Sequence, residues 1–427
     1  MKVINLKNAG SFRRVGGIGL MGCFWLGFGG AALANTEVVL QFESALRHES
    51  NPFRFVDGTN GLATLKTDST SDSIFSNDLR FSVAHPLDSP DTRLVLGGLV
   101  GQRNYRQFTH LNHTEYAYRG GLEWRWSTLW KGEVIRAQEQ KLYDYQDGSI
   151  TDREMTHKTT DSVGVALRVT PSLDIPLILK AQKLSYDTVT NLPFESEERS
   201  ADIGVAFRSE TGSNFRTGVK ANDVKFLQRT ALLIATADSR YRDDELYLEA
   251  DWQYSVLTRF GARVARLERT YDALKNLNLS TTTSEASVVY EYSPKTRFTL
   301  NVWNRPSGST DPATLYTTVT GGQAAVRWQT TEKTRLSVQY GSEMERYKTT
   351  TAWVGQPDPE LKRTRLGASL VYAVSRDIAL YVEGLNDELN RGSIGSGISQ
   401  RTLRTGLEYT FEGVPGLAQK TGLGARR

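Results

Sequence analysis

The sequence predicts an all-β fold, a transmembrane antiparallel up-and-down β-barrel of about eighteen strands, with roughly sixteen as the smaller count that the same pattern allows. Three observations predict it: a secretory leader, a side-chain period of two along most of the remaining chain, and short turns that alternate with longer polar loops. The mean hydropathy of -0.42 is too polar for a bundle of membrane helices.

The first element is a leader, which we expect to be cleaved after residue 34. It contains four basic side chains, Lys2, Lys7, Arg13 and Arg14, and no acidic ones, and then an uncharged stretch. Ala-Leu-Ala at 32–34 suits a signal peptidase, so the mature chain is expected to begin at Asn35, directly after Ala34. The alternatives are an uncleaved anchor helix, which the many glycines disfavour, and a lipid on Cys23, the single cysteine, which the apolar residues after it disfavour.

The charge of the mature chain excludes one class of partner. The whole chain has 52 basic and 48 acidic residues, and removing the four basic residues of the leader leaves 48 of each. A neutral mature protein with no basic surplus gives no support to nucleic-acid binding.

Alternation along the chain predicts the strands. The clearest case is 114–128, where one parity holds Tyr116, Tyr118, Leu122, Trp124 and Trp126 and the other holds Glu115, Arg119, Glu123 and Arg125. One face of such a strand is aromatic and the other is charged. We expect the aromatic face to meet lipid, with Trp and Tyr forming girdles near the turns.

Turns and loops predict the wiring. Short turns are expected near Ser89, Trp130, Ser172, Gly212, Leu257, Pro294, Glu332 and Arg376, with a longer polar segment between each pair. Eight turns and nine loops imply about eighteen strands, with turns in the periplasm and loops outside. A β-propeller has a similar period but needs shorter strands. The barrel is expected at 35–413, ending in a strand at 401–412, and residues 414–427 are expected to be a flexible basic C-terminal tail.

The parity opposite to the lipid face predicts which side chains line the lumen. The predicted lumen or polymer-contact residues are Arg125, Arg168, Arg208, Arg263, Arg297, Arg327, Arg335, Tyr247 and Trp303. The arginines lie near turns, whereas Glu115, Glu245, Glu249 and Glu285 lie near loops. We therefore expect a lumen that is basic at the periplasmic end and acidic at the outer end.

The sequence predicts no catalytic set, metal or cofactor. Five histidines are present without a hydrolase or metalloprotease motif around them. His110, His113 and Glu115 form the one metal-like group, and polar loop histidines of this kind are common.

The opening segment, from Phe42 to Phe55, resembles the start of the EpsL-type exopolysaccharide-biosynthesis barrel family. The residues that carry the resemblance are Glu49, Asn51, Phe53 and Arg54, while Ser50 stands where that family often has Asp. The resemblance implies an outer-membrane protein that acts with polysaccharide synthesis and export functions, and it implies no catalytic residues.

We therefore expect a non-enzymatic protein of the outer membrane that assists exopolysaccharide biosynthesis, export or surface handling. The alternatives are a general diffusion porin for small solutes and an outer-membrane hydrolase. The expected partners are outer-membrane lipid and lipopolysaccharide, the barrel-assembly machinery during insertion, and a secreted polysaccharide with its export components.

Overall fold

The computed structural model describes residues 36–56, 65, 67, 69–87, 91–145, 151–307, 314–349, 360–391 and 397–413. The expected leader, its cleavage site at Ala34 and Asn35, and the expected tail at 414–427 lie outside the described residues. Within them, no helix is both long enough and apolar enough to cross a membrane.

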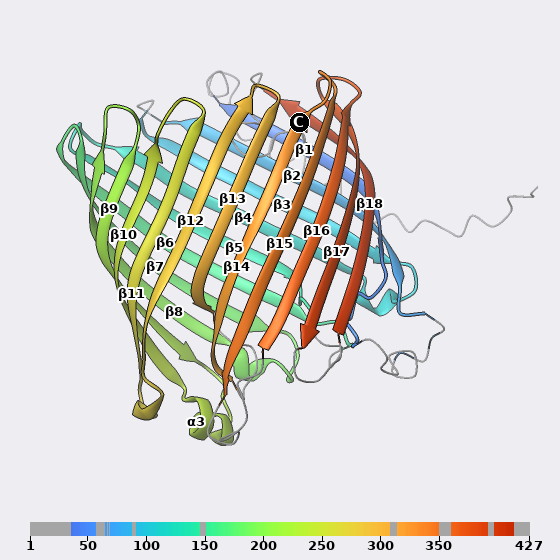
Figure 1. Cartoon of the computed structure of the whole chain (residues 1–427), viewed down its shortest axis with the longest axis horizontal. Helices are drawn as coiled ribbons and strands as arrows, with labels where there is room; N and C mark the ends of the chain where they lie inside the picture. Colours follow the sequence, from blue (N-terminus) through green and yellow to red (C-terminus); the bar gives the residue numbers. More distant parts are fainter. Residues whose placement is uncertain are drawn as a thin grey trace, which may run out of the picture. The chain divides into compact units, whose positions relative to one another are not determined.

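Eighteen antiparallel strands form one closed sheet (Figure 1). The first nine are β1 (Glu37–Glu49), β2 (Asp72–Pro86), β3 (Arg93–Tyr105), β4 (His113–Arg125), β5 (Trp130–Leu142), β6 (Met155–Thr170), β7 (Leu173–Tyr186), β8 (Ser196–Arg208) and β9 (Asn214–Phe226). The second nine are β10 (Arg240–Gln253), β11 (Thr258–Tyr271), β12 (Leu279–Ser293), β13 (Thr296–Ser307), β14 (Thr314–Gln329), β15 (Thr334–Thr349), β16 (Glu360–Ala373), β17 (Ile378–Arg391) and β18 (Gly397–Glu412).

Each strand pairs with its neighbour in the sequence, and β18 returns to pair with β1. Phe42 of β1 lies opposite Tyr409 of β18, and Leu79 of β2 lies on its other side. Closure leaves no unpaired sheet edge, which a membrane-spanning sheet requires. The predicted barrel of about eighteen strands is confirmed.

Short connections lie at one end of the barrel, here called the turn end, together with the start of β1 and the end of β18. Longer connections lie at the other end, here called the loop end. Strands of 12 to 16 residues are long enough to cross a bilayer when tilted. The helices whose full bounds the structure describes at the loop end are three short 3-10 helices and the α-helix α3 (Ala231–Ala237), where the sequence predicted loop alone. Thr230 caps α3 by accepting a hydrogen bond from the amide of Leu233 at 3.4 Å.

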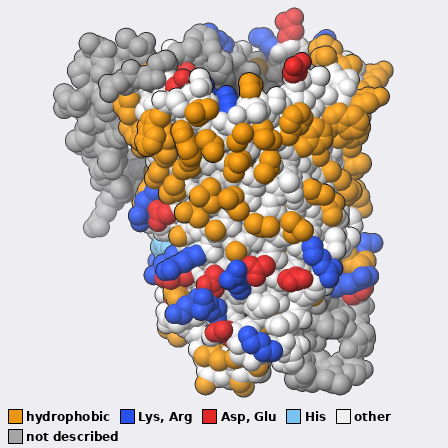
Figure 2. Space-filling model, turned by 90° about the vertical axis from the view of Figure 1, so that its left-hand side faces the viewer, with side chains coloured by type: hydrophobic (Ala, Val, Ile, Leu, Met, Phe, Trp, Pro, Cys, Tyr) orange, Lys and Arg blue, Asp and Glu red, His pale blue; other side chains and the backbone are white. Residues whose placement is uncertain are grey.

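Apolar side chains cover the outer face in a band nearer the turn end (Figure 2). Aromatic pairs lie beside the turns, among them Trp124 with Trp126 and Trp252 with Tyr254. Exposed apolar side chains in such numbers would be costly in water, whereas in a bilayer they face acyl chains. The band thus marks the depth at which the barrel sits in the membrane.

Candidate functional site

The lumen wall is built by the alternate residues of every strand. On β10, Tyr247 is 2% exposed, whereas its neighbours Leu246 and Leu248 on the outer face are 60% and 65% exposed. The period of two thus places polar and charged groups inside along most strands, as the sequence predicted. The lumen is the candidate functional site, because it is lined by charged and polar side chains from one end to the other.

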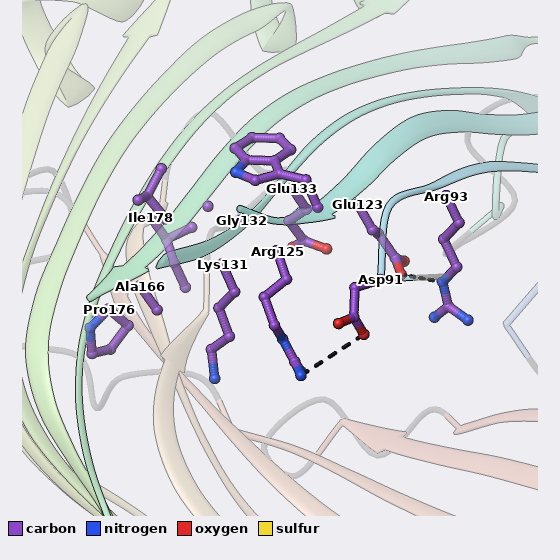
Figure 3. A pocket seen from close by; sticks show the side chains of 13 residues that line it. Asp91, Arg93, Glu123, Arg125, Lys131, Gly132, Glu133, Ala166, Pro176 and Ile178 are labelled. Atoms are coloured by element: carbon purple, nitrogen blue, oxygen red, sulfur yellow. Dashed lines mark hydrogen bonds and ion pairs between the residues drawn. The ribbon is translucent and has the colours of Figure 1, made fainter. Parts of the chain in front are cut away.

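A cavity of about 460 Å³ opens into the lumen at the turn end, between β3 and β7 (Figure 3). Arg93, Arg125 and Lys131 point from the wall into it. The Nε of Arg93 lies 2.7 Å from a carboxylate oxygen of Glu123, and Nη1 of Arg125 lies 3.8 Å from Oδ1 of Asp91. Cations and carboxylates therefore alternate along this part of the wall.

One carboxylate collects several of the predicted arginines. Asp174 accepts a hydrogen bond from Nζ of Lys131 at 2.7 Å and one from Nε of Arg168 at 3.2 Å. Nη2 of Arg208 lies 4.0 Å from the same carboxylate. The structure thus brings together Arg168 and Arg208, two strands apart, at one acidic residue that the sequence reading missed.

The remaining predicted arginines also face the lumen, where they lie beside other charged side chains or line a cavity. Arg263 forms an ion pair with Glu245, and Arg297 forms one with Glu291. Arg327 lies directly opposite Arg297 in the register of β13 and β14. Arg335 lines a second cavity at the turn end, which extends from the end of β14 to the turn after β16, and it is 8% exposed.

The predicted gradient of charge needs correction. At the turn end the carboxylates of Asp91, Asp174 and Glu291 accompany the arginines. At the loop end the carboxylate of Glu115 contacts Nη2 of Arg103 at 2.9 Å, and Glu285 contacts Arg305 at 3.2 Å. Charge is therefore compensated locally along the lumen. Period-two parity assigns a face to each residue but does not show which strand neighbours will pair.

The two predicted inward aromatics differ in what they can contact. The hydroxyl of Tyr247 donates to Oδ1 of Asp202 at 2.7 Å, and the guanidinium groups of Arg216 and Arg263 lie 5.4 and 4.9 Å from its ring centroid. Because only 2% of Tyr247 is exposed, its ring is not accessible to a sugar in this structure. Trp303 faces inward over Gly321, and an added Cβ on that glycine would lie 3.0 Å from the indole. A side chain at position 321 would therefore crowd the indole, Cγ of Glu343 and the carbonyl oxygen of Ser342.

The opening segment that carries the family resemblance folds inward at the loop end. Phe53 is 0% exposed and packs edge-on against Phe108 and Tyr145, with ring centroids 4.9 and 5.2 Å away. Asn51 shapes the segment, because its side chain donates to the carbonyl oxygen of Phe55 at 2.8 Å and accepts from the amide of Phe55 at 2.9 Å. Glu49 ends β1 and pairs with Arg47 at 3.2 Å.

Arg54 places a third cation beside one carboxylate of β17. Its backbone φ of 56° is in the left-handed region, and its Nη2 lies 3.8 Å from Asp387 and 3.4 Å from Asp144. Nε of Arg363 donates to the same Asp387 at 2.8 Å, and Nε of Arg365 lies 3.6 Å from it. Burial, and also the neighbouring Arg363, lower the pKa of Arg54 from its ordinary value. We call Arg54, Arg363, Arg365 and Asp387 the mouth cluster.

The histidines near this mouth hold loops together. His113 contacts the carbonyl oxygen of Leu111 at 2.6 Å and Glu115 at 3.1 Å, whereas His110 contacts the carbonyl oxygen of Thr151 at 3.0 Å. Their rings thus bond to different loops. Across the part of the chain that the structure describes, no three His, Cys, Asp or Glu side chains are placed to hold a metal ion.

Comparison with known proteins gives a likeness of fold. No family model matches the chain, and no curated protein matches it. OccK9 (OpdG) of Pseudomonas aeruginosa has a TM-score of 0.50 at 9% identity, over 89% of this chain and 100% of that chain. The outer membrane protein opdK of the same organism has a TM-score of 0.49 at 10% identity, over 88% and 99%. The siderophore receptor PirA, also of Pseudomonas aeruginosa, has a TM-score of 0.45 at 6% identity, over 87% and 80%.

A closed antiparallel barrel of eighteen strands with an apolar outer band places the protein in the outer membrane. The expected role in exopolysaccharide biosynthesis, export or surface handling is wrong, because the fold is similar to that of OccK9, and this likeness favours the alternative of a diffusion porin. The likeness of the opening segment to the EpsL-type family stays a prediction. In this structure that segment, with Asn51, Phe53 and Arg54, builds the inward fold at the mouth.

Proposed function

We propose that this protein is an outer-membrane channel through which small hydrophilic solutes diffuse. The observation that carries the proposal is the lumen wall, in which polar and ion-paired side chains run from the turn-end cavity to the mouth cluster. Barrels of 16 to 18 strands are wide enough to leave an aqueous channel. A wall of this kind provides water and solutes with hydrogen-bonding partners along the whole path.

Local charge compensation supports weak selectivity between ions. Each pair, such as Arg93 with Glu123 or Lys131 with Asp174, presents both signs at one depth of the channel. A solute of either charge therefore meets a partner and a repulsive group together. We expect size to be the main discriminator over most of the length.

The inward fold at the loop end supports a size limit. Phe53 and Phe55 pack with Tyr105, Phe108 and Tyr145 in one buried cluster, and the cluster holds this segment against the inner side of β2 and β3. A rigid segment inside the mouth narrows it without closing the rest of the lumen. Large polymers are therefore poor candidates for passage.

We assign the protein no catalytic role. The similar structures that bear functional names are an outer membrane protein and a siderophore receptor. In the described lumen, ion pairs engage many of the charged side chains, as Arg168 is engaged with Asp174.

The test is conductance through a single introduced thiol. Cys23 is first replaced by Ser, and Cys is then placed at Gln323, which faces the lumen and bonds to Gln339, or at Ala324, which faces lipid. We expect ion current through planar bilayers, and we expect a bulky anionic thiol reagent to reduce it for Gln323→Cys but not for Ala324→Cys. Absence of current above that of a protein-free bilayer would contradict the proposal, as would equal block in both variants.

A further inference from the structure

The outer face carries a strip of charged side chains on the loop side of the apolar band (Figure 2). These residues point away from the lumen, because they share the parity of Leu246 and Leu248 on β10 and of Ile203 on β8. The strip therefore lies outside the barrel, at the depth where the acyl chains end. A ligand of this strip is therefore expected to be a membrane component and not a solute in the channel.

Strand register places the strip in two rows across β7 to β10. The row farther from the lipid joins Lys183, Glu197, Lys225 and Arg240. The row nearer the lipid joins Arg199, Asp223 and Arg242. Together the two rows hold five cations and two carboxylates. The positive surplus is local, since the whole chain of 427 residues has 52 basic and 48 acidic residues.

Asp223 lies at the centre of three guanidinium groups. Arg240 donates to it twice, from Nε at 2.8 Å and from Nη2 at 2.5 Å. Arg199 of β8 and Arg242 of β10 lie directly opposite Asp223 in the register on either side. Arg242 also donates to Oδ1 of Asp244, at 3.0 and 2.8 Å, in the next row toward the lipid. The three arginines thus face two carboxylates, Asp223 and Asp244, and the positive charges of this group exceed the negative ones by one.

The apolar row beneath the strip fixes its depth. Leu177, Ile203, Val219 and Leu246 lie side by side in the register, two rows nearer the turn end than Arg199 and Arg242. Adjacent residues of one face are about 7 Å apart along a strand, so the arginines lie within one or two such steps of the acyl region. Loops point outside the cell, so this is the headgroup region of the outer leaflet.

We propose that Arg199, Arg240 and Arg242, here called the outer arginine patch, bind the phosphate groups of an anionic glycolipid of the outer leaflet. Guanidinium groups match phosphate with paired hydrogen bonds, and cationic side chains at a membrane surface attract anionic headgroups. The acyl chains would lie on the apolar row below, and the phosphates would lie between the arginines. This inference is independent of the proposed channel function.

The experiment measures binding of lipid A to the purified full-length chain in a neutral detergent. The probes are bis-phosphorylated lipid A, the same lipid with both phosphates removed, and inorganic phosphate. We expect the bis-phosphorylated lipid to bind roughly tenfold more tightly than the dephosphorylated one, with the difference lost at high salt. Inorganic phosphate alone should not compete at millimolar concentration, because it lacks the acyl chains.

Two variants locate the site. Replacing Arg199, Arg240 and Arg242 with Gln should weaken binding of the bis-phosphorylated lipid by roughly tenfold. The control replaces three outward cations elsewhere, Arg136, Arg346 and Lys362, with Gln and so changes the net charge equally. That control should bind like the parent chain. Asp223→Asn should bind more tightly than the parent, because it removes the carboxylate that Arg240 contacts.

The proposal is overturned if the two lipids bind the parent chain equally, a result that needs no variant. It is also overturned if the patch variant, shown to be folded by its heat-dependent gel migration, binds like the control. Equal weakening in both triple variants would show a general charge effect and would overturn the assignment to this patch.

Discussion

At the scale of residues, single acidic side chains organise the loop end. Asp238 precedes β10 and has a backbone φ of 61°, which is uncommon for a residue other than glycine. Its Oδ2 accepts hydrogen bonds from the amides of Ala273 and Leu274, at 2.6 and 2.9 Å, in the loop that follows β11. Burial alone would raise the pKa of Asp238, but these amides and those of Ser239 and Arg240 outweigh it and lower the pKa.

The same construction occurs at a second loop. Asp72 begins β2 and accepts hydrogen bonds from the amides of Arg106, Gln107 and Phe108 after β3, at 3.1, 2.9 and 2.8 Å. The side chain of Asn112 then accepts from the amide of Tyr105 at 2.7 Å, as Asn278 does from Tyr271 at 2.9 Å. Carboxylates thus fasten loops to the barrel through backbone donors that would otherwise be unsatisfied.

We predict that Asp238→Asn loosens the loop after β11. The amides of Ala273 and Leu274 should exchange hydrogen at least tenfold faster, because losing a charged acceptor costs about 1–3 kcal/mol. Hydrogen exchange read by mass spectrometry checks this, with Asp272→Asn, an exposed carboxylate of the same loop, as the control. Because the pKa of Asp238 is lowered, its contribution is complete above its ordinary pKa of about 4 and is lost as pH falls below that value. Protection that persists unchanged in Asp238→Asn would contradict this.

At the scale of elements, each strand is a two-sided object whose faces obey different rules. On β13, Leu300 faces lipid and pairs with Val288 and Ala324, whereas Asn301 faces the lumen and pairs with Ser287 and Gln323. Side chains at outward positions lie among acyl chains and are therefore apolar, whereas side chains at inward positions contact water and charged groups. A charged substitution is therefore costly at one residue and tolerated at the residue next to it.

We predict that Leu300→Arg lowers the free energy of unfolding by about 2–4 kcal/mol, the penalty for arginine near the bilayer midplane. Asn301→Arg should change it by less than about 1 kcal/mol, because the lumen is hydrated and carries paired charges. Urea unfolding from lipid bilayers, followed by tryptophan fluorescence, measures both. A larger loss for Asn301→Arg than for Leu300→Arg would mean that the two faces are assigned the wrong way round.

At the scale of the whole molecule, the mouth cluster joins parts of the chain that are far apart. Arg54 follows β1, while Arg363, Arg365 and Asp387 belong to β16 and β17. Three guanidinium groups share Asp387, and the second carboxylate near Arg54, that of Asp144, is largely exposed. Among the ion pairs of the mouth, three guanidinium groups therefore face two carboxylates, Asp144 and Asp387.

We predict that replacing Arg54 and Arg365 with Gln shifts the reversal potential in a salt gradient toward cations, at low salt above all. The matched control replaces Arg47 and Lys141, two inward cations near the loop end that each lie beside one carboxylate of their own strand. The control should shift the reversal potential by less than half as much, because Arg47 and Lys141 each lie beside one carboxylate that compensates their charge. Equal shifts would show that the mouth cluster does not set ion preference.

The sequence by itself determined the strand number, the placing of turns and loops, and the face on which Arg125, Arg263 or Trp303 lies. These follow from a period of two and from turn residues, which are local properties of a chain between lipid and water. Only the tertiary structure decided that Arg168 and Arg208 share Asp174, that Tyr247 lies beside arginines, and that Arg54 reaches Asp387. Those contacts depend on strand register and on barrel closure, which bring together residues that no local pattern in the chain relates.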